Sequence, residues 1–496
     1  MVGKLYNGKK STLKLMGGYS YQYFQNSGMS ASNKDFPSDI LSYNNLAQGE
    51  WAKEEGRNEM GSYKNDSKLI AFLGRINYDY KGRYLFTASY RYEGSSKFGK
   101  NNKWGSFPAV SAGWRMSEEN FMKDATWINE LKIRGDFGVT GNQNFDSYKS
   151  LATMQGFGSY YHEGSYFTVW GPAKNPNYNL KWEKGVNWNI GVDFSMFDNI
   201  FSGSLNYYKQ QDLLGDYNVS VPPYLFASTF VNVGTMRNTG FELDLNVQAV
   251  KTKDFSYNIG FVGATNNNKF LHFSNNEFTG QAFQDVCNME SPGNPGTLQR
   301  MQEGERLGNY FTWSYAGIDE NGNWLVWNKD NTEKISINEA TTEDKRVTGN
   351  GLPKFTASLS NTFSYKNWDL TVFLSGAFGF DIYNVHDLYY GLQSAPGNVL
   401  KKAYDKNAGI TTGLTDYFLE KGDYLKLDVV TLGYRFNINN KWLDSIRLYV
   451  TGKNLATITG FSGVDPASYQ MNGLTPGTNN GTRNYYPTTT QLLFGL

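Results

Sequence analysis

The chain has 496 residues, and its 47 basic and 46 acidic side chains leave a formal net charge of +1, which gives no electrostatic footprint for a nucleic acid. Its single cysteine, Cys287, excludes an intramolecular disulfide framework and a multi-cysteine metal site. No apolar run is long enough to predict a membrane-spanning helix, yet 16% of the residues are aromatic while only 39% are hydrophobic.

Alternating sequence defines the predicted strands. Segment 83–93, RYLFTASYRYE, places rings such as Tyr84 and Tyr90 at even positions, while Arg91 and Glu93 stand at odd positions. Successive side chains of a strand point to opposite faces, so this segment predicts a strand with one aromatic face and one charged face. Because the pattern recurs along the chain, it predicts a wall with lipid on one side and water on the other.

In chain order, the pattern predicts about fourteen strands. They cover residues 11–24, 68–80, 83–93, 104–116, 128–140, 181–196, 200–212, 229–249, 254–267, 351–365, 368–380, 423–437, 442–454 and 488–496. Most exceed the roughly 9 to 11 residues that cross a bilayer at a tilt, so some should project beyond it.

The connections between these strands alternate in length. Short ones, such as 81–82 and 366–367, alternate with long loops. The long loops lie near residues 25–67, 141–180, 268–350, 381–422 and 455–487. An antiparallel meander with tight turns at one rim and large loops at the other has this rhythm, as outer-membrane barrels do. We expect the loop over 268–350 to contain a hairpin of its own around the turn-rich run Asp319–Asn323.

Ionisable side chains recur on the polar strand faces, and we expect them to line a hydrated lumen of mixed charge. They are Arg91, Glu93, Arg134, Asp136, Asp193, Glu242 and Asp244. Paired carboxylates could also serve glycoside chemistry, but basic neighbours on the same faces favour the lumen. The three histidines stand apart without metal-ligand spacing, and we expect no enzyme activity, metal or cofactor.

Loop aromatics are the best candidates for binding a substrate or a partner. They are Tyr160, Tyr161, Tyr166, Phe167 and Trp170 in loop 141–180, and Tyr383, Tyr389 and Tyr390 in loop 381–422. Aromatic faces can stack on sugar rings or pack on a partner protein. They could equally serve to pack the loops on one another.

Six ordered blocks of sequence closely resemble the SusC/RagA-type outer-membrane proteins, a branch of the TonB-dependent transporters. The blocks are LIAFLGRINYDYKGRYLFTASYRYEGSSKFGKNNKWGSFPAVSAGWRMSEENF from Leu69, LKIRGDFGVTGNQNF from Leu131, NTGFELDLNV from Asn238, GNGLPKFTASLSNTFSYKNWDLTVFLSGAFG from Gly349, YLKLDVVTLGYRF from Tyr424 and RLYVTGKNLATITGFSGVDP from Arg447.

This resemblance implies an antiparallel transmembrane β-barrel of 22 strands in a Gram-negative outer membrane, with a plug domain and a TonB-contacting segment. It also implies uptake of oligosaccharides or peptides together with a SusD-like surface lipoprotein. Since about fourteen strands are fewer than 22, we expect residues 1–496 to be the C-terminal part of one barrel domain. The plug, and with it the contact to the TonB complex, would then lie before Met1.

Two other classes of protein remain as alternatives. A complete, passive porin-like barrel of about fourteen strands would explain the even strand count, and it would require the strand of Leu13 to pair with that of Leu492. A secreted multi-domain β-sandwich that binds glycans is the other alternative. The family resemblance argues against the porin, and the rhythm of long and short connections argues against the sandwich.

Overall fold

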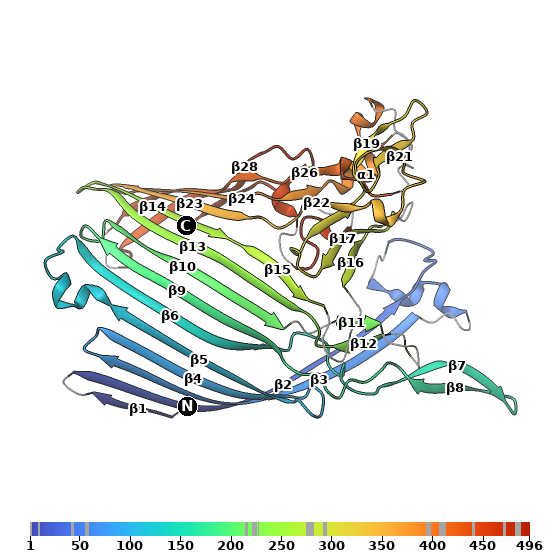
Figure 1. Cartoon of the computed structure of the whole chain (residues 1–496), viewed down its shortest axis with the longest axis horizontal. Helices are drawn as coiled ribbons and strands as arrows, with labels where there is room; N and C mark the ends of the chain where they lie inside the picture. The colour runs from blue at the N-terminus through green and yellow to red at the C-terminus, as the bar shows by residue number, and fades with distance from the viewer. Residues whose placement is uncertain are drawn as a thin grey trace.

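One antiparallel sheet of sixteen strands dominates the computed structural model (Figure 1). The structure describes residues 2–7, 10–40, 44–54, 59–213, 217–220, 226, 228–273, 282–290, 295–392, 398–405, 413–438, 442–469, 473–481 and 488–496. Along the sheet the strands keep their order in the chain, and β15 lies beside β13. No helix among the described residues is long and apolar enough to cross a membrane.

All of the predicted strands are present in this sheet. Its members are β1 (Val2–Asn7), β2 (Ser11–Ser32), β3 (Glu59–Tyr80), β4 (Tyr84–Ser95), β5 (Trp104–Arg115), β6 (Ile128–Asn142), β9 (Glu183–Met196), β10 (Phe201–Leu213), β13 (Thr235–Lys251), β14 (Phe255–Thr265), β15 (Asn267–His272), β23 (Phe355–Tyr365), β24 (Trp368–Phe378), β27 (Tyr424–Asn437), β28 (Ser445–Thr459) and β29 (Gln491–Gly495). The sequence does not predict β1 as a strand, and it places nearly all of β15 in the loop predicted over 268–350.

The two faces of the wall follow the predicted parity. On β4, Tyr84, Phe86 and Tyr90 are 45–50% exposed, whereas Glu93 on the opposite face is only 8% exposed. The same alternation leaves Tyr19 on β2 and Trp188 on β9 exposed. In a barrel wall these rings face lipid, and the polar side chains of the other face are turned inward.

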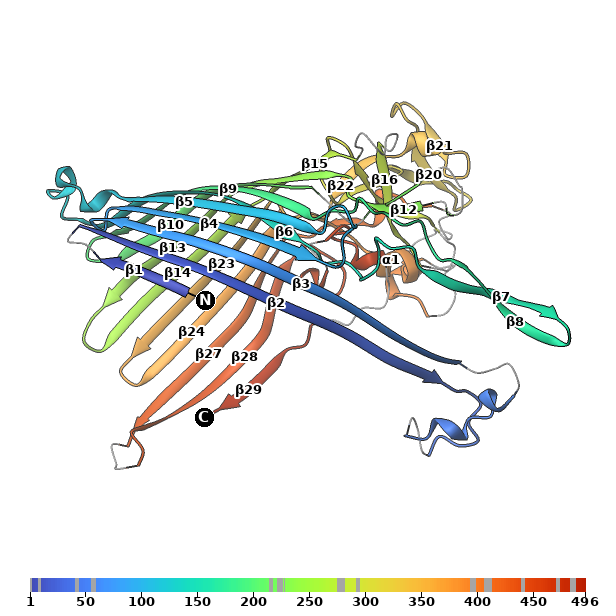
Figure 2. The ribbon, with the colours of Figure 1, turned by 90° about the horizontal axis from the view of Figure 1, so that it is seen from below.

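The sheet is curved but open (Figure 2). Leu13 pairs with Tyr6 and Tyr78, and Leu492 pairs with Gly452. No ladder joins the strand of Leu13 to that of Leu492 among the described residues. The closed barrel of about fourteen strands, considered from the sequence, is therefore wrong for this structure.

Strands β2 and β3 are much longer than the sequence predicted, with 22 residues each. At about 3.3 Å per residue, each extends over about 70 Å, against a hydrocarbon core of about 30 Å. The apolar alternation ends near Phe24, but the ladder continues from Gln25↔Asp66 to Ser32↔Glu59. Beyond the membrane both faces of the hairpin meet water, so neither face needs to be apolar. The sequence there does not alternate between apolar and polar residues, and it therefore does not predict a strand.

The tight turns lie at one end of the strands and the large connections at the other (Figure 2). Between β3 and β4, Lys81 and Gly82 both have positive φ, 57° and 66°, as a type I′ hairpin turn requires. Glycine tolerates this conformation because it has no Cβ. The predicted rhythm is thus confirmed, except that part of the turn over 438–441 lies outside the described residues.

The described residues of the large connections carry small sheets, several one-turn 3-10 helices and one short α-helix. The sheets and the α-helix are β7 (Met154–His162) with β8 (Ser165–Pro172), β11 (Tyr217–Ser220) with β12 (Ser228–Val231), β16 (Phe283–Asn288), β17 (Thr297–Gln302), β18 (Asn309–Thr312) and β22 (Arg346–Asn350), β19 (Tyr315–Ile318), β20 (Trp324–Trp327) and β21 (Lys334–Ser336), β25 (Asp381–Tyr383) with β26 (Leu419–Lys421), and α1 (Val385–Tyr390). The hairpin expected around Asp319 is present as β19–β20, with the Asp319 carboxylate accepting hydrogen bonds from the backbone N–H groups of Asn321 and Asn323.

The largest buried core lies in these connections rather than in the wall. We call the assembly of β16–β22, β25, β26, α1 and segment 413–418 the cap. Its fully buried side chains include Leu298, Tyr310, Val326, Tyr383 and Phe418. A single sheet has no second layer to cover it, so buried clusters form where the connections fold onto one another or onto the adjoining ends of wall strands, as at Phe107 and Tyr424.

The assigned faces predict unequal tolerance to charge. Replacing Tyr90, which is 50% exposed on the aromatic face, with Asp should destabilise the assembled wall by about 2 kcal/mol, because the carboxylate would have to enter lipid. Ser89→Asp on the opposite face should be tolerated. The fraction of folded barrel on unheated denaturing gels measures both, and equal losses would contradict the face assignment.

Candidate functional site

The polar face of the wall carries a network that spans three strands. The Asp193 carboxylate lies 3.1 Å from Lys132 Nζ and 3.0 Å from Arg134 Nε. Arg134 Nη2 also donates to Asn206 Oδ1 at 2.5 Å. Gly191 stands between Arg134 and Asn206 in the ladders. A Cβ there would lie 2.4 Å from Asn206 Oδ1, so the glycine leaves the space that the guanidinium uses to reach β10.

A second ion pair lies within one strand. Arg91 donates to Glu93 from Nε at 2.7 Å and from Nη2 at 2.5 Å. Residues two apart share a face, which brings the two side chains together. The bidentate geometry fixes both groups, and the carboxylate is thus matched in charge where it is buried.

The other predicted polar residues also lie on strands of the wall. Asp136 stands opposite Ser111 and Asn189 in the two neighbouring strands. Glu242 is exposed, and Asp244 accepts a hydrogen bond from Asn246 Nδ2 at 2.7 Å. The structure thus brings acids next to bases and amides. Among the described residues it brings no group of three or more metal-ligating side chains together.

The aromatics of the first loop form a hairpin that projects from the wall, β7–β8 (Figure 2). Tyr161 pairs with Tyr166 at a ring distance of 5.2 Å, and Tyr160 with Phe167 at 5.8 Å. The exposed fractions are 53% for Tyr160, 63% for Tyr161, 77% for Tyr166, 48% for Phe167 and 65% for Trp170. The hairpin therefore presents aromatic rings on both of its faces.

The aromatics of the second loop lie in a different environment. Tyr383 and Tyr389 are 0% and 7% exposed within the core of the cap, and Tyr390 packs against that core. The Tyr383 hydroxyl donates to the carbonyl oxygen of Thr415 at 3.0 Å, and that of Tyr389 donates to the carbonyl oxygen of Glu290. These rings pack loop against loop, which is the alternative that the sequence left open.

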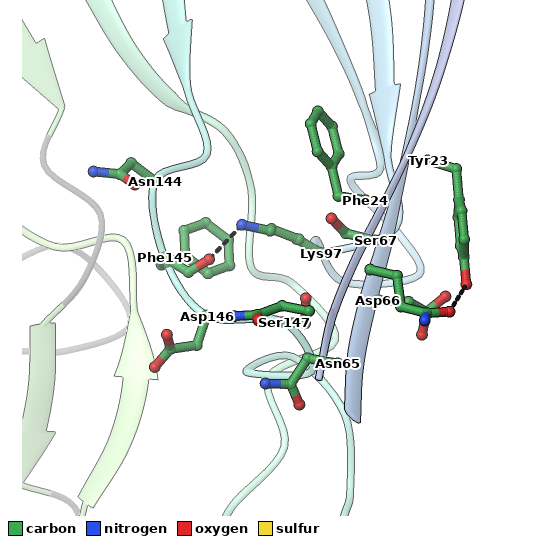
Figure 3. Close-up of a pocket in the computed structure, with 12 residues that line it drawn as sticks. Tyr23, Phe24, Asn65, Asp66, Ser67, Lys97, Asn144, Phe145, Asp146 and Ser147 are labelled. Carbon is green, nitrogen blue, oxygen red and sulfur yellow. Dashed lines mark hydrogen bonds between the residues drawn. The ribbon is translucent and has the colours of Figure 1, made fainter. Parts of the chain in front are cut away.

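The structure also forms a cavity that the sequence analysis did not predict, with a volume of about 630 Å³ (Figure 3). It lies where β2 and β3 extend past the end of β4 and meet segment 143–148. The lining residues are Tyr23, Phe24, Gln25, Asn26, Asn65, Asp66, Ser67, Lys97, Asn144, Phe145, Asp146 and Ser147. Three amide-rich segments, QNS, KNDS and GNQN, supply many of these residues. They are so far apart in the chain that their convergence could not be read from the sequence.

Two anchors hold the loop that closes this cavity. Lys97 Nζ donates to the carbonyl oxygens of Phe145 at 2.6 Å and Gln143 at 3.3 Å. The Asp66 N–H donates to the Tyr148 hydroxyl at 2.9 Å, and that hydroxyl donates to the Asp66 carboxylate. This last hydrogen bond raises the pKa of Tyr148, because ionising the phenol would place two negative charges side by side.

A family model described as "TonB dependent receptor-like, beta-barrel" matches residues 3–455. The chain belongs to this family. "TonB-dependent receptor P3" of Formosa agariphila is 30% identical over 520 residues, covering 98% of this chain and 50% of that protein. "TonB-dependent receptor SusC" of Bacteroides thetaiotaomicron is 28% identical over 438 residues, covering 82% and 42%. The resemblance to SusC/RagA-type proteins is confirmed.

A solved structure shares the fold of this TonB-dependent receptor chain. The "RagAB peptide transporter" aligns with a TM-score of 0.80 at 22% identity, over 99% of this chain and 54% of that one. The chain spans about half the length of the curated relatives that it matches. The family and the all-β wall establish an outer-membrane β-barrel protein, as the sequence predicted.

Removing the shared carboxylate should destabilise the polar face. Asp193→Asn leaves Lys132 and Arg134 as neighbouring, partly buried cations, which should cost about 1–2 kcal/mol. The midpoint of urea unfolding measures this. Asp244→Asn is the control, since among the described residues the Asp244 side chain accepts only the hydrogen bond from Asn246. A larger effect in the control would contradict the assigned network.

The cysteine should be chemically inert while the cap is folded. Burial raises the pKa of the Cys287 thiol to about 11, so the reactive thiolate is scarce at neutral pH. Labelling by a maleimide at pH 7.5 should be slow in the folded receptor and rapid after unfolding in urea. Rapid labelling of the folded receptor would contradict this burial.

Proposed function

We propose that this receptor chain forms part of the wall of a TonB-dependent importer that takes up oligosaccharides or peptides across the outer membrane. The observation that carries the proposal is a wall with an aromatic outer face and a polar inner face, in a chain of this family. The name of the structural neighbour, the RagAB peptide transporter, supports peptides as a cargo. Oligosaccharides are proposed from the resemblance to SusC-type proteins.

In this proposal the polar face lines the path of the cargo. Arg91, Arg134, Asp136, Asp193 and Glu242 belong to that lining, together with Glu93 and Asp244. The ion pairs balance Arg91 against Glu93 and Asp193 against Lys132 and Arg134. The further carboxylates Asp136, Glu242 and Asp244 keep the lining hydrated and net acidic, so a neutral polar molecule can pass without being bound tightly. No step makes or breaks a covalent bond, and the energy reaches the receptor through TonB. We assign the TonB contact to no residue of this chain.

We further propose that the projecting hairpin contacts a SusD-like surface lipoprotein or the incoming cargo. An isolated two-stranded hairpin is marginally stable in water, and the exposed rings of Tyr161, Tyr166 and Trp170 are the residue types that dominate protein interfaces. By contrast, Tyr383 and Tyr389 are buried in the core of the cap, and this proposal does not include them.

Uptake by the host bacterium tests the importer. Deleting the gene should abolish growth on at least one oligosaccharide or peptide source, and a protonophore should stop the uptake that the gene supports. Passive passage that continues after the proton-motive force collapses would contradict TonB coupling.

A separate experiment tests the hairpin. The double variant Tyr166→Ser, Trp170→Ser should assemble normally but lower lipoprotein co-purification or cargo affinity at least fivefold, since it removes one exposed aromatic face. Phe121→Ala, an equally exposed ring on the connection between β5 and β6, is the control. Unchanged lipoprotein recovery and unchanged cargo affinity would contradict the role of the hairpin.

A further inference from the structure

We propose that the cavity between β2, β3 and segment 143–148 is a binding subsite for a neutral carbohydrate (Figure 3). The inference rests on the proposed function, because the ligand would be part of the imported cargo. It adds to the proposed function the place of one ligand subsite in the wall and the chemical class of the ligand bound there. A volume of about 630 Å³ lies within the usual range for small-ligand sites, roughly 300–1,000 Å³.

The register of the β2–β3 ladder places one side of the cavity on the polar face. Phe24 pairs with Ser67, and Asn26 pairs with Asn65. The ladder has no bulge between Leu13 and these pairs, so even positions of β2 stay on the face opposite Leu13. Phe24, Asn26, Asn65 and Ser67 therefore face the same way as the proposed lining, at the end of the wall that bears the large connections.

Phe24 supplies an open ring face within polar surroundings. It is 51% exposed, and it makes no ring contact with another described residue. Phe145 across the cavity is already committed, because it packs against Phe98 at 5.3 Å and Phe230 at 5.6 Å. A free aromatic face on the polar side of the ladder suits a sugar ring, which offers apolar C–H groups on its faces and hydroxyls at its edge.

The amide groups around Phe24 are free to bind hydroxyls. The side chains of Asn26, Asn65 and Asn144 are exposed, and none of the three makes a side-chain hydrogen bond to a described residue. A carboxamide offers both donors and an acceptor, so it can pair with neighbouring hydroxyl groups that also do both. Such a set favours a polyhydroxylated ligand over an apolar one.

The charges at the cavity are of both signs and are held by hydrogen bonds or an ion pair, and this balance favours a neutral ligand. Lys97 is held by the carbonyl oxygens of Gln143 and Phe145, and Asp66 accepts from Tyr148. Asp146 lies 3.4 Å from Lys149, and Figure 3 shows its carboxylate turned away from Lys97. Lys97 and Asp66 thus keep charges of opposite sign, and the cavity has no excess of either sign that would select an acidic glycan or a charged peptide.

Binding to an immobilised ligand panel tests the subsite. The full-length receptor in detergent would be applied to neutral α- and β-glucans, mannan, xylan, galactan and fructan, to polygalacturonate and to tryptic casein peptides. We expect at least one neutral glycan to retain the receptor. Phe24→Ala and Asn65→Ala should each weaken that affinity at least tenfold, while Phe24→Trp, which keeps an aromatic face, and Phe121→Ala, at a distant connection, should not.

Three results would overturn the subsite. They are undiminished glycan binding in Phe24→Ala and Asn65→Ala, retention only by peptides or polygalacturonate, and retention by none of the ligands. Folding of each variant is checked by its mobility on unheated gels. Uptake is measured separately in the gene-deletion strain that produces the Phe24→Ala receptor. Normal import by this variant would contradict the subsite alone. Unchanged uptake after gene deletion would instead contradict the proposed importer function.

Discussion

The need to pair every backbone N–H and C=O group within lipid governs this protein. An antiparallel ladder meets that need from strand to strand, and the continuous pairing from β2 to β28 provides it. Side chains are then free to differ by face. Tyr90 can remain exposed to an apolar medium while Glu93, three residues on, pairs with Arg91. The order of the wall therefore depends on its hydrogen bonds more than on a packed interior.

This division explains what the sequence could predict. Alternation arises wherever two faces meet different solvents, so strands such as β4 and β9 and their parities were readable from the residues alone. It vanishes where both faces meet water, which is why the sequence does not predict the outer parts of β2 and β3, residues 25–32 and 59–67, as strand. Tyr161 and Tyr383 looked alike in sequence, but only tertiary packing decides that one is exposed and the other buried. The cavity required three segments to converge.

The polar face combines fixed charge with free amide groups. Along β6 and β9 the ions satisfy one another, as Asp193 does for Lys132 and Arg134. At the end of the wall that bears the large connections, Asn26 and Asn65 keep their hydrogen-bonding groups available. Under the proposed function, a polar cargo would meet free amide donors and acceptors at the rim and ion pairs that are satisfied within the protein along β6 and β9.

Among the described residues, β7 and β8 pair only with each other, while the cap joins side chains from several connections into one core. These arrangements differ in evolutionary freedom. A substitution at Phe418 or Tyr310 must be accommodated by neighbours from distant parts of the chain, so the cap can drift only slowly. Residues such as Tyr166 and Trp170 can be replaced, and the hairpin that bears them can be lengthened or lost, without disturbing a strand of the wall. Descendants of one ancestral barrel could in this way acquire new recognition surfaces while their scaffold stayed the same.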